Sequence, residues 1–303
     1  MGTGTVARYL SPMVLGEIVT MRNISLLIKP VSGICNMTCD YCFYCDEAKK
    51  RTQHVYGMMN EKTLETIIEK TISEADAVAS FTWQGGEPTL RGIDFFEKAA
   101  ALQKKYKQQY QRNNLHIMNA FQTNGYELDR QWAKFFKRNQ FLVGLSIDGL
   151  PEIHDSLRKG KDGSKSFFRV KQAAVLLDKY QVDYNILTVV TSQAAERIKE
   201  IYPFYKKCGW NYQQYIACLE PFGEKSGTKP YSLSQNSTET FFQICLNCGI
   251  MICKAQVSHI LDSLKTMWDW PQDIWQNLVS KGDAAEYSMQ WKQMEASIRV
   301  IFT

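Results

Sequence analysis

The chain alternates short apolar segments with longer segments in which apolar residues recur at helical spacing. Short apolar runs are typical of buried strands, and apolar residues three or four positions apart are typical of amphipathic helices. The six predicted strands are residues 24–30, 78–84, 115–122, 141–147, 182–190 and 212–217. The predicted helices between them are residues 59–75, 95–106, 128–138, 167–180 and 194–208.

This alternation predicts βαβ units, right-handed crossovers and a parallel sheet, which together define an α/β fold. Ligands of such sheets bind at the carboxyl ends of the strands. Polar and glycine-rich segments follow the first four predicted strands at residues 33–44, 85–88, 122–125 and 146–149. The pattern therefore predicts one functional site, built from these segments at one edge of the sheet.

The segment GICNMTCDYCFY, residues 33–44, contains Cys35, Cys39 and Cys42 with C-x3-C-x2-C spacing. Iron–sulfur clusters are held by cysteine thiolates, usually four of them. Three thiolates in one short segment can hold three corners of a cubane cluster and leave one iron open. That open iron can bind a small molecule through its amine and carboxylate groups. The spacing is typical of the radical SAM superfamily, and the aromatic Tyr41 before Cys42 agrees with it.

A structural zinc site is the alternative for the same cysteines. Zinc sites usually pair C-x2-C with a second C-x2-C or with spaced histidines. The chain has four His, and none lies within residues 33–44. Cys45 is followed by Asp46 and Glu47, which favours an exposed loop over a fourth ligand. The cluster interpretation is preferred because further motifs agree with it.

The GGEP segment after the second predicted strand is the first of these motifs. Gly85 and Gly86 lack a side chain, so a ligand can approach the backbone closely and positive φ values are accessible. Glu87 adds an acceptor, and Pro88 stiffens the exit from the loop. An ordinary strand-to-helix turn is the competing interpretation.

Other polar residues at strand ends are candidates with plain structural alternatives. Asp148 could accept hydrogen bonds from hydroxyl groups, or could simply belong to an Asp-Gly turn. Tyr44 could stack on an adenine ring or pack in the core. His154, Asp155 and Arg158 could form a hydrogen-bonded cluster near the site or a solvated helix start. The candidate cofactor-binding residues are Tyr44, Gln84, Gly85, Gly86, Glu87, Gln122, Asn124, Ser146 and Asp148. No catalytic residue is assigned.

Composition narrows the functional class. The 303 residues are 45% hydrophobic and 22% charged, which is typical of a globular protein with one large or two smaller domains. The net charge of +5 is too small to indicate nucleic-acid binding, and no apolar run is long enough to span a membrane. No secretory signal is apparent. Nine cysteines, an odd number, favour metal binding in a reducing cytoplasm over disulfides.

Together the motifs resemble the anaerobic sulfatase-maturating enzymes, which are radical SAM proteins with a second, cysteine-rich SPASM domain. The match runs from about Met21 to about Ser234. It is carried by SLLIKPVSGICNMTCDYCFY (residues 25–44), TWQGGEPTLRG (82–92), FQTNG (121–125), LSIDGLPEIHDSLRK (145–159), NILTVVT (185–191) and QQYIACLEP (213–221).

The resemblance implies a partial (β/α)6 barrel, a 4Fe–4S cluster on Cys35, Cys39 and Cys42, and S-adenosylmethionine as the second cofactor. It places GGEP at the cofactor's amino group, and Ser146 and Asp148 near its ribose and methionine parts. The cluster would reduce the cofactor, and the resulting 5′-deoxyadenosyl radical would remove a hydrogen from Cβ of a sulfatase cysteine or serine, giving formylglycine. A flavodoxin or ferredoxin would supply electrons.

Two alternatives remain open. The SPASM group includes several peptide modifiers, so the chain could mature another peptide substrate. With zinc on the cysteine segment, it would instead be a non-catalytic metal-binding protein. The sequence does not identify the sulfatase, the oligomeric state, or whether cysteine or serine is the target.

The resemblance divides the chain into an N-terminal extension (residues 1–20), a radical SAM barrel (21–234) and an atypical tail (235–303) that replaces the start of a SPASM domain. Met21 is the expected natural start. Cys245, Cys248 and Cys253 lie in apolar, helix-like sequence without glycine-rich loops, so they are not predicted to be cluster ligands.

The tail is predicted to be the product of a frameshift beginning near residues 235–240. In the frame that starts on the third base of each codon, Trp291-Lys292 must encode Glu and Met294-Glu295 must encode Gly. With permitted codons, residues 290–303 then spell the family's motif of a cluster cysteine followed by aspartate. The hypothesis predicts that the auxiliary-cluster ligands are missing and that maturation activity is lost.

Overall fold

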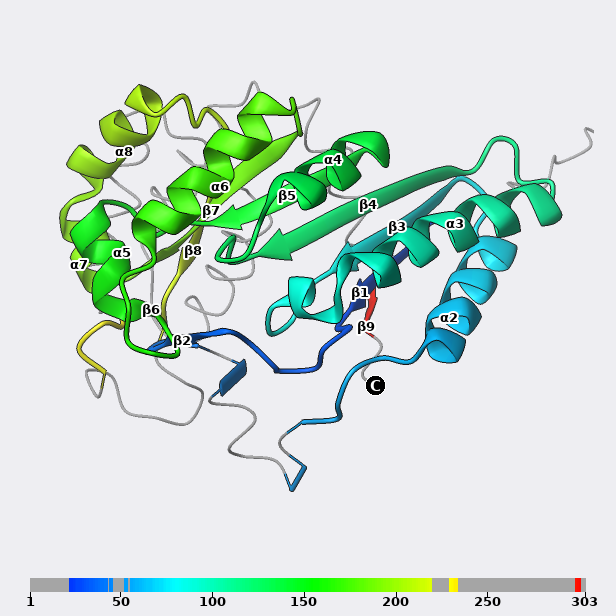
Figure 1. Cartoon of the computed structure of the whole chain (residues 1–303), viewed down its shortest axis with the longest axis horizontal. Helices are drawn as coiled ribbons and strands as arrows, with labels where there is room; N and C mark the ends of the chain where they lie inside the picture. Colours follow the sequence, from blue (N-terminus) through cyan, green and yellow to red (C-terminus); the bar gives the residue numbers. More distant parts are fainter. Residues whose placement is uncertain are drawn as a thin grey trace, which may run out of the picture.

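The computed structural model describes residues 22–42, 44–45, 52–53, 55–219, 229–233 and 298–300. Its main sheet has seven strands in the order β8-β7-β5-β4-β3-β1-β9, and every neighbouring pair is parallel (Figure 1). The strands are β1 (Ile24–Ile28), β3 (Val78–Trp83), β4 (His116–Thr123), β5 (Phe141–Ser146), β7 (Tyr184–Val190), β8 (Gln213–Ala217) and β9 (Ile298–Val300). The six predicted strands and the α/β half-barrel are confirmed, whereas β9 was not predicted.

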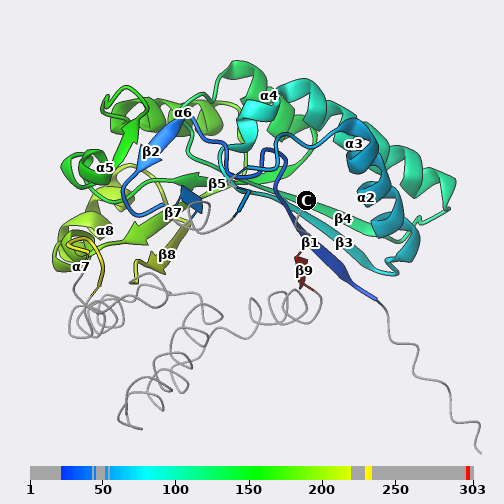
Figure 2. The same ribbon diagram turned by 90° about the horizontal axis from the view of Figure 1, so that it is seen from below.

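Helices connect the successive strands of this sheet from β1 to β8. They are α2 (Glu61–Glu74), α3 (Ile93–Gln109), α4 (Arg130–Arg138), α5 (Pro151–Leu157), α6 (Phe167–Lys179), α7 (Ser192–Glu196) and α8 (Ile198–Lys207), with a 3-10 turn η1 (Pro88–Arg91). Figure 2 shows α2, α3, α4 and α6 on one side of the sheet. The predicted helix 194–208 is divided into two helices, α7 and α8, at Arg197. The segment after the fourth predicted strand, for which a helix start was one interpretation, forms the helix α5.

Local sequence explains where several helices begin. The Asn60 side chain accepts a hydrogen bond from the Thr63 amide at the start of α2. Asp129 caps α4 through the amides of Gln131 and Trp132. Such caps satisfy amides that have no partner within the helix, and each contributes about 1 kcal/mol.

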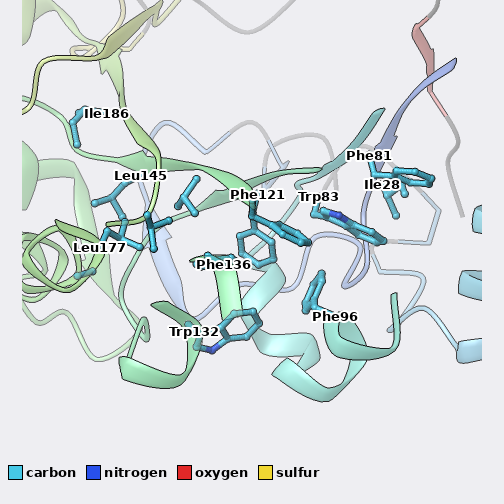
Figure 3. Packing of buried hydrophobic residues seen from close by; sticks show 14 of the residues in the cluster. Ile28, Phe81, Trp83, Phe96, Phe121, Trp132, Phe136, Leu145, Leu177 and Ile186 are labelled. Atoms are coloured by element: carbon cyan, nitrogen blue, oxygen red, sulfur yellow. The ribbon is translucent and has the colours of Figure 1, made fainter. Parts of the chain in front are cut away.

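An aromatic core fills the space between the sheet and these helices (Figure 3). Trp83 of β3 packs edge-on against Phe96 of α3, with ring centroids 5.4 Å apart. Phe121 of β4 lies 4.9 Å from Phe136 of α4 by the same measure. These large buried rings hold the strands in place, and so fix the positions of the loops at their carboxyl ends.

A small second sheet joins the cysteine segment to the rest of the barrel. β2 (Met37–Cys39) pairs antiparallel with β6 (Arg158–Gly160), which follows α5 directly (Figure 1). Cys39 lies opposite Arg158 in this ladder, and the Asp40 amide donates to the Leu157 carbonyl at 3.1 Å. The sequence did not predict this pair, because its two strands are three residues long and far apart in the chain.

Two predicted parts of the chain lie outside the described residues. These are the N-terminal extension and, apart from residues 298–300, the atypical tail with Cys245, Cys248 and Cys253. Among the described residues, no helix is long and apolar enough to cross a membrane. The frameshift stays a prediction.

Candidate functional site

The three cysteines of the C-x3-C-x2-C segment lie together after β1. Cys35, Cys39 and Cys42 are all half-buried and all free thiols. The Cys42 amide donates to the Cys39 carbonyl at 3.0 Å, which makes a tight turn between the second and third thiols. The segment thus presents three reduced sulfur atoms from a short, hydrogen-bonded stretch of backbone.

The surroundings of the thiols suit thiolate ligands. The Met37 amide points at Cys35 Sγ from 3.4 Å, and Asn124 Nδ2 lies 3.6 Å from the same sulfur. Burial raises the pKa of the Cys35 thiol, while these donors lower it. Burial also raises the pKa of Cys39 to about 12, and the Arg158 charge offsets part of that effect. Hydrogen bonds to sulfur and nearby charge are the usual means by which a protein tunes a bound cluster.

The spacing of these thiols fits a multinuclear cluster. Within the described part of the chain, no three His, Cys, Asp or Glu side chains are grouped to hold a single metal ion. In a cubane each thiolate binds a different iron, so the sulfur atoms need not converge on one point. Cys35 and Cys39 nevertheless interact electrostatically with each other and with Cys42. The donor set therefore fits a cluster held by three cysteines.

The GGEP loop packs directly against the cysteine segment. The Glu87 amide donates to the Ile34 carbonyl at 2.8 Å, one residue before Cys35. Gly86 has φ +56°, and a Cβ there would lie 2.1 Å from the same carbonyl oxygen. Glycine is therefore required for the two loops to meet.

Glu87 itself points into the protein. Its side chain is 0% exposed, and its carboxylate accepts hydrogen bonds from four donors. The donors are the Thr89 amide and hydroxyl, the Thr123 hydroxyl and the Asn124 amide. Burial raises the pKa of Glu87, and these hydrogen bonds offset only part of the rise. The carboxylate ties the end of β3 to the end of β4; its predicted contact with a cofactor stays a prediction.

Tyr44 and Gln84 form one contact across the site. Gln84 Nε2 donates to the Tyr44 hydroxyl at 3.0 Å, and Lys29 Nζ lies 4.8 Å from the Tyr44 ring centroid. Tyr44 is half-buried, and burial raises the pKa of its hydroxyl. Two predicted cofactor residues are thereby brought together beside the cysteine segment.

Asn124 joins the end of β4 to the cysteine segment. Its Nδ2 donates to Asn36 Oδ1 at 2.8 Å, and its Oδ1 accepts from the Tyr126 amide at 2.8 Å. Asn36 and Tyr126 were not singled out in the sequence, and no local pattern marks them. Asn124 therefore orients the loop that carries Cys35.

Gln122 and Ser146 meet on neighbouring strands. Gln122 Nε2 donates to Ser146 Oγ at 3.0 Å across β4 and β5. Gly144 makes room for this contact, because a Cβ there would lie 2.1 Å from Gln122 Oε1. Both side chains were predicted to contact the cofactor, and the structure brings them together at the carboxyl end of the sheet.

Asp148 lies in a buried polar cluster with Tyr41 and Arg158. Its Oδ2 accepts from the Tyr41 hydroxyl and from Arg158 Nη1, the latter at 3.5 Å, and its Oδ1 accepts from the Val189 amide at 2.9 Å. Arg158 Nη1 also donates to the Tyr41 hydroxyl at 2.7 Å. Burial raises the pKa of Tyr41 well above its ordinary value, so the hydroxyl keeps its proton.

In the described structure, His154, Asp155 and Arg158 are linked through Ser166 and not by hydrogen bonds to one another, and His154 is 0% exposed. His154 Nδ1 accepts from the Asp148 amide at 3.2 Å, and Nε2 contacts Ser166 Oγ at 2.9 Å. Ser166 Oγ in turn donates to the Arg158 carbonyl at 2.7 Å. Burial lowers the pKa of His154 well below its ordinary value, which keeps the ring neutral. Asp155 accepts from the Ser166 amide at 2.9 Å.

These loops match a known family. The Radical SAM superfamily profile matches residues 30–204, which is more than half of the 303-residue chain. The chain belongs to the Radical SAM superfamily. This family uses a 4Fe–4S cluster and S-adenosylmethionine, as the cysteine segment predicted.

Curated relatives refine the match. The chain is 44% identical over 223 residues to the cysteine-type anaerobic sulfatase-maturating enzyme of Clostridium perfringens, with 74% of this chain and 59% of the relative covered. It is 38% identical over 196 residues to the serine-type enzyme of Bacteroides thetaiotaomicron, with 64% and 46% covered. The predicted resemblance is confirmed. The chain spans about three-fifths, 59%, of the first of these relatives.

A solved structure agrees with the fold. The chain is similar to native anSMEcpe with bound AdoMet and Cp18Cys peptide, with a TM-score of 0.69 and 42% identity. The match covers 75% of this chain and 59% of that chain. It confirms the partial (β/α)6 radical SAM fold.

Proposed function

We propose that this chain is the cofactor-binding barrel of a radical SAM oxidoreductase that converts a sulfatase cysteine or serine to formylglycine. Cys35, Cys39 and Cys42 hold a 4Fe–4S cluster, and S-adenosylmethionine binds beside it. When bound, the cluster would supply one electron to S-adenosylmethionine. A flavodoxin or ferredoxin is the proposed electron donor, and a reducing, oxygen-poor cytoplasm preserves the thiols.

The observation that carries this proposal is the direct contact between the cysteine segment and GGEP. The Glu87 amide and the Ile34 carbonyl join the loops after β1 and β3, so a molecule bound at the cysteine segment would lie beside the GGEP backbone. The relatives' names support the choice of substrate, since they are sulfatase-maturating enzymes. The bound Cys peptide in the similar structure supports a polypeptide target.

Residues of this chain bind and orient the two cofactors in the proposed site. Gly85 and Gly86, both at positive φ, shape the loop whose backbone would meet the ligand's amino group. Ser146 and Gln122 offer a hydroxyl and an amide at the ends of β5 and β4. Tyr44, held by Gln84, offers an aromatic face near the third cysteine.

The test is anaerobic purification of the full chain and reconstitution with iron and sulfide. The proposal predicts acid-labile sulfide, together with cleavage of S-adenosylmethionine to 5′-deoxyadenosine. Each of Cys35→Ala, Cys39→Ala and Cys42→Ala should abolish both. Cys208→Ala is the control, because Cys208 caps α8 and lies outside the cysteine segment. Bound zinc without sulfide would overturn the enzyme proposal in favour of a structural metal site.

Peptide turnover separates the remaining possibilities. A short sulfatase peptide with cysteine or serine at the target position is incubated with the reconstituted chain, and formylglycine is measured by mass spectrometry. A frameshifted tail predicts cofactor cleavage without formylglycine. Turnover of an unrelated peptide, but not of the sulfatase peptide, would point to the other maturases.

A further inference from the structure

We infer that Arg158 is a positioning residue for the cluster: it holds the cysteine segment through Tyr41 and places a permanent positive charge beside Cys39, which raises the cluster's reduction potential. This inference rests on the proposed function, because it assumes that Cys35, Cys39 and Cys42 bind a cluster. It assigns to Arg158 a role that the motif pattern did not show.

The small β2–β6 sheet brings Arg158 to Cys39. The two residues are directly opposite in the antiparallel ladder. Opposite residues of such a ladder project their side chains to the same face. The neighbouring pair, Thr38 and Lys159, therefore projects to the other face. The register thus places one cation on the cysteine's side of the ladder and the next one away from it.

Arg158 also holds the turn between the second and third cysteines. Its Nη1 donates to the Tyr41 hydroxyl at 2.7 Å and approaches Asp148 Oδ2 at 3.5 Å. Tyr41 lies between Cys39 and Cys42 in the sequence, and its hydroxyl also donates to Asp148. One guanidinium nitrogen therefore holds one of the two residues that separate these proposed ligands.

The Arg158 charge is buried, and one of its hydrogen-bond donors is unpaired in the described structure. The side chain is 8% exposed, and its Nε has no hydrogen-bond partner in the described structure. Buried charges act through a lower effective dielectric than surface charges, so their influence on neighbours is larger. Asp148 Oδ2 lies 3.5 Å from Arg158 Nη1 and offsets part of the charge, whereas Arg158 itself stands directly opposite Cys39 in the ladder. Replacing Arg158 therefore removes the cation on the Cys39 side of the ladder and leaves the Asp148 carboxylate in place.

A positive charge beside a cluster stabilises its reduced, more negative state. Net charge, hydrogen bonding and burial are the properties that set cluster potentials. An arginine cannot lose its proton in a protein, so this contribution does not vary with pH. Arg158 would therefore ease the one-electron reduction that precedes cofactor cleavage.

The test compares midpoint potentials of the reconstituted full chain by EPR-monitored titration, without S-adenosylmethionine. Arg158→Gln should lower the midpoint potential of the cluster by ~59 mV, which for one electron is about a tenfold lower ratio of reduced to oxidised cluster at a fixed applied potential. Arg158→Lys keeps the charge but loses the planar fork of the guanidinium, so a smaller shift of the midpoint potential in the same direction is expected. Asp148→Asn should shift the potential the opposite way.

Lys159→Gln is the matched control. It removes one positive charge from the adjacent ladder position, but Lys159 is 40% exposed and faces away from Cys39. Its potential should equal that of the wild type. An Arg158→Gln potential equal to wild type would overturn the inference.

Folding and loading are followed alongside the potentials. Thermal unfolding of the unloaded variants and their iron and sulfide contents are measured. If Arg158→Gln does not fold, Arg158→Lys and Asp148→Asn decide, and shifts of the same sign in both would overturn the inference. A wild-type chain without acid-labile sulfide would overturn the proposed function as well, whereas a loaded chain with unchanged potentials would overturn this inference alone.

Discussion

Glu87 and Asp148 are both buried carboxylates at strand ends, but they are held by different kinds of partner. Glu87 accepts hydrogen bonds from neutral groups, the amides and hydroxyls of Thr89, Thr123 and Asn124. Asp148 accepts from the charged Arg158, the Tyr41 hydroxyl and the Val189 amide. Each carboxylate joins one loop of the site to another.

The difference shows how two similar sequence signals serve different parts of the site. Glu87 has neutral donors alone, and burial raises its pKa more than these hydrogen bonds lower it. It fastens the GGEP loop to β4. Asp148 instead has a cation beside it, and that pair extends to the cysteine segment through Tyr41. The first carboxylate fixes a backbone loop, and the second belongs to the electrostatic environment of the thiols.

Removing the Glu87 carboxylate is expected to have the largest effect on stability. Glu87→Ala leaves four buried donors without their acceptor, and each unsatisfied group costs about 1–3 kcal/mol. With partial relaxation we expect the free energy of unfolding to fall by about 3–5 kcal/mol. Urea denaturation of the chain measures it.

Glu97→Ala is the control for this change. Glu97 makes an ion pair with Arg138 at the surface, where such pairs contribute about 1 kcal/mol or less. Equal losses in the free energy of unfolding for the two variants would show that the hydrogen bonds to Glu87 do not stabilise the fold more than a surface ion pair does.

The contact between GGEP and the cysteine segment gives the second prediction. Gly86→Ala puts a Cβ 2.1 Å from the Ile34 carbonyl oxygen, so the loops must separate. We expect a loss of about 3 kcal/mol from overpacking and positive φ together, and a lower iron content after reconstitution. Gly209→Ala shares the positive φ (+78°) but meets no atom within 4 Å, so about 1 kcal/mol is expected there. A Gly86→Ala chain as stable as Gly209→Ala would contradict the close contact.

The sequence predicted the elements better than the connections between them. Apolar runs located all six strands of the half-barrel, because a strand buried by helices needs a continuous apolar segment. The three cysteines and the two glycines of GGEP were found from spacing and from the backbone requirements of a turn. The residues at strand ends were found because parallel strands bring their carboxyl ends to one edge.

The connections within the site depend on tertiary contacts that have no local pattern. β2 and β6 pair across more than a hundred residues of chain, so no periodicity within either segment marks them. The inward turn of Glu87 depends on Thr89 and Thr123, which are ordinary residues in the sequence. The position of Arg158 opposite Cys39 likewise follows from the ladder register, which only the structure gives.

The third prediction concerns the removal of one of the four hydrogen-bond donors to the Glu87 carboxylate. Thr123→Val removes the hydroxyl that donates to Glu87 Oε1 at 2.8 Å and accepts from the Gly125 amide at 3.0 Å. We expect a loss of about 1.5 kcal/mol, in the range for a buried hydrogen bond to an ionisable group. Thr66→Val is the matched control, because the Thr66 hydroxyl donates to the Lys62 carbonyl on an exposed helix surface and should change stability by about 0.5 kcal/mol or less. The free energy of unfolding of both variants is measured by urea denaturation. Equal losses of stability would contradict a structural role for the Thr123–Glu87 hydrogen bond.

The last prediction concerns the buried cluster around Asp148. His154 belongs to it, because its Nδ1 accepts a hydrogen bond from the Asp148 amide. The folded chain keeps this ring neutral, because burial lowers its pKa well below 6.5, whereas the unfolded chain binds a proton there below that pH. Unfolding therefore takes up a proton, and this contribution to stability is lost as pH falls below about 6.5. The slope is at most about 1.4 kcal/mol per pH unit. His154→Gln should flatten the stability–pH curve in urea titrations, whereas replacing the exposed His116 by Gln should not. Parallel curves for wild type and His154→Gln would mean that the buried network tolerates a protonated ring, and would place the acid-sensitive group elsewhere in the chain.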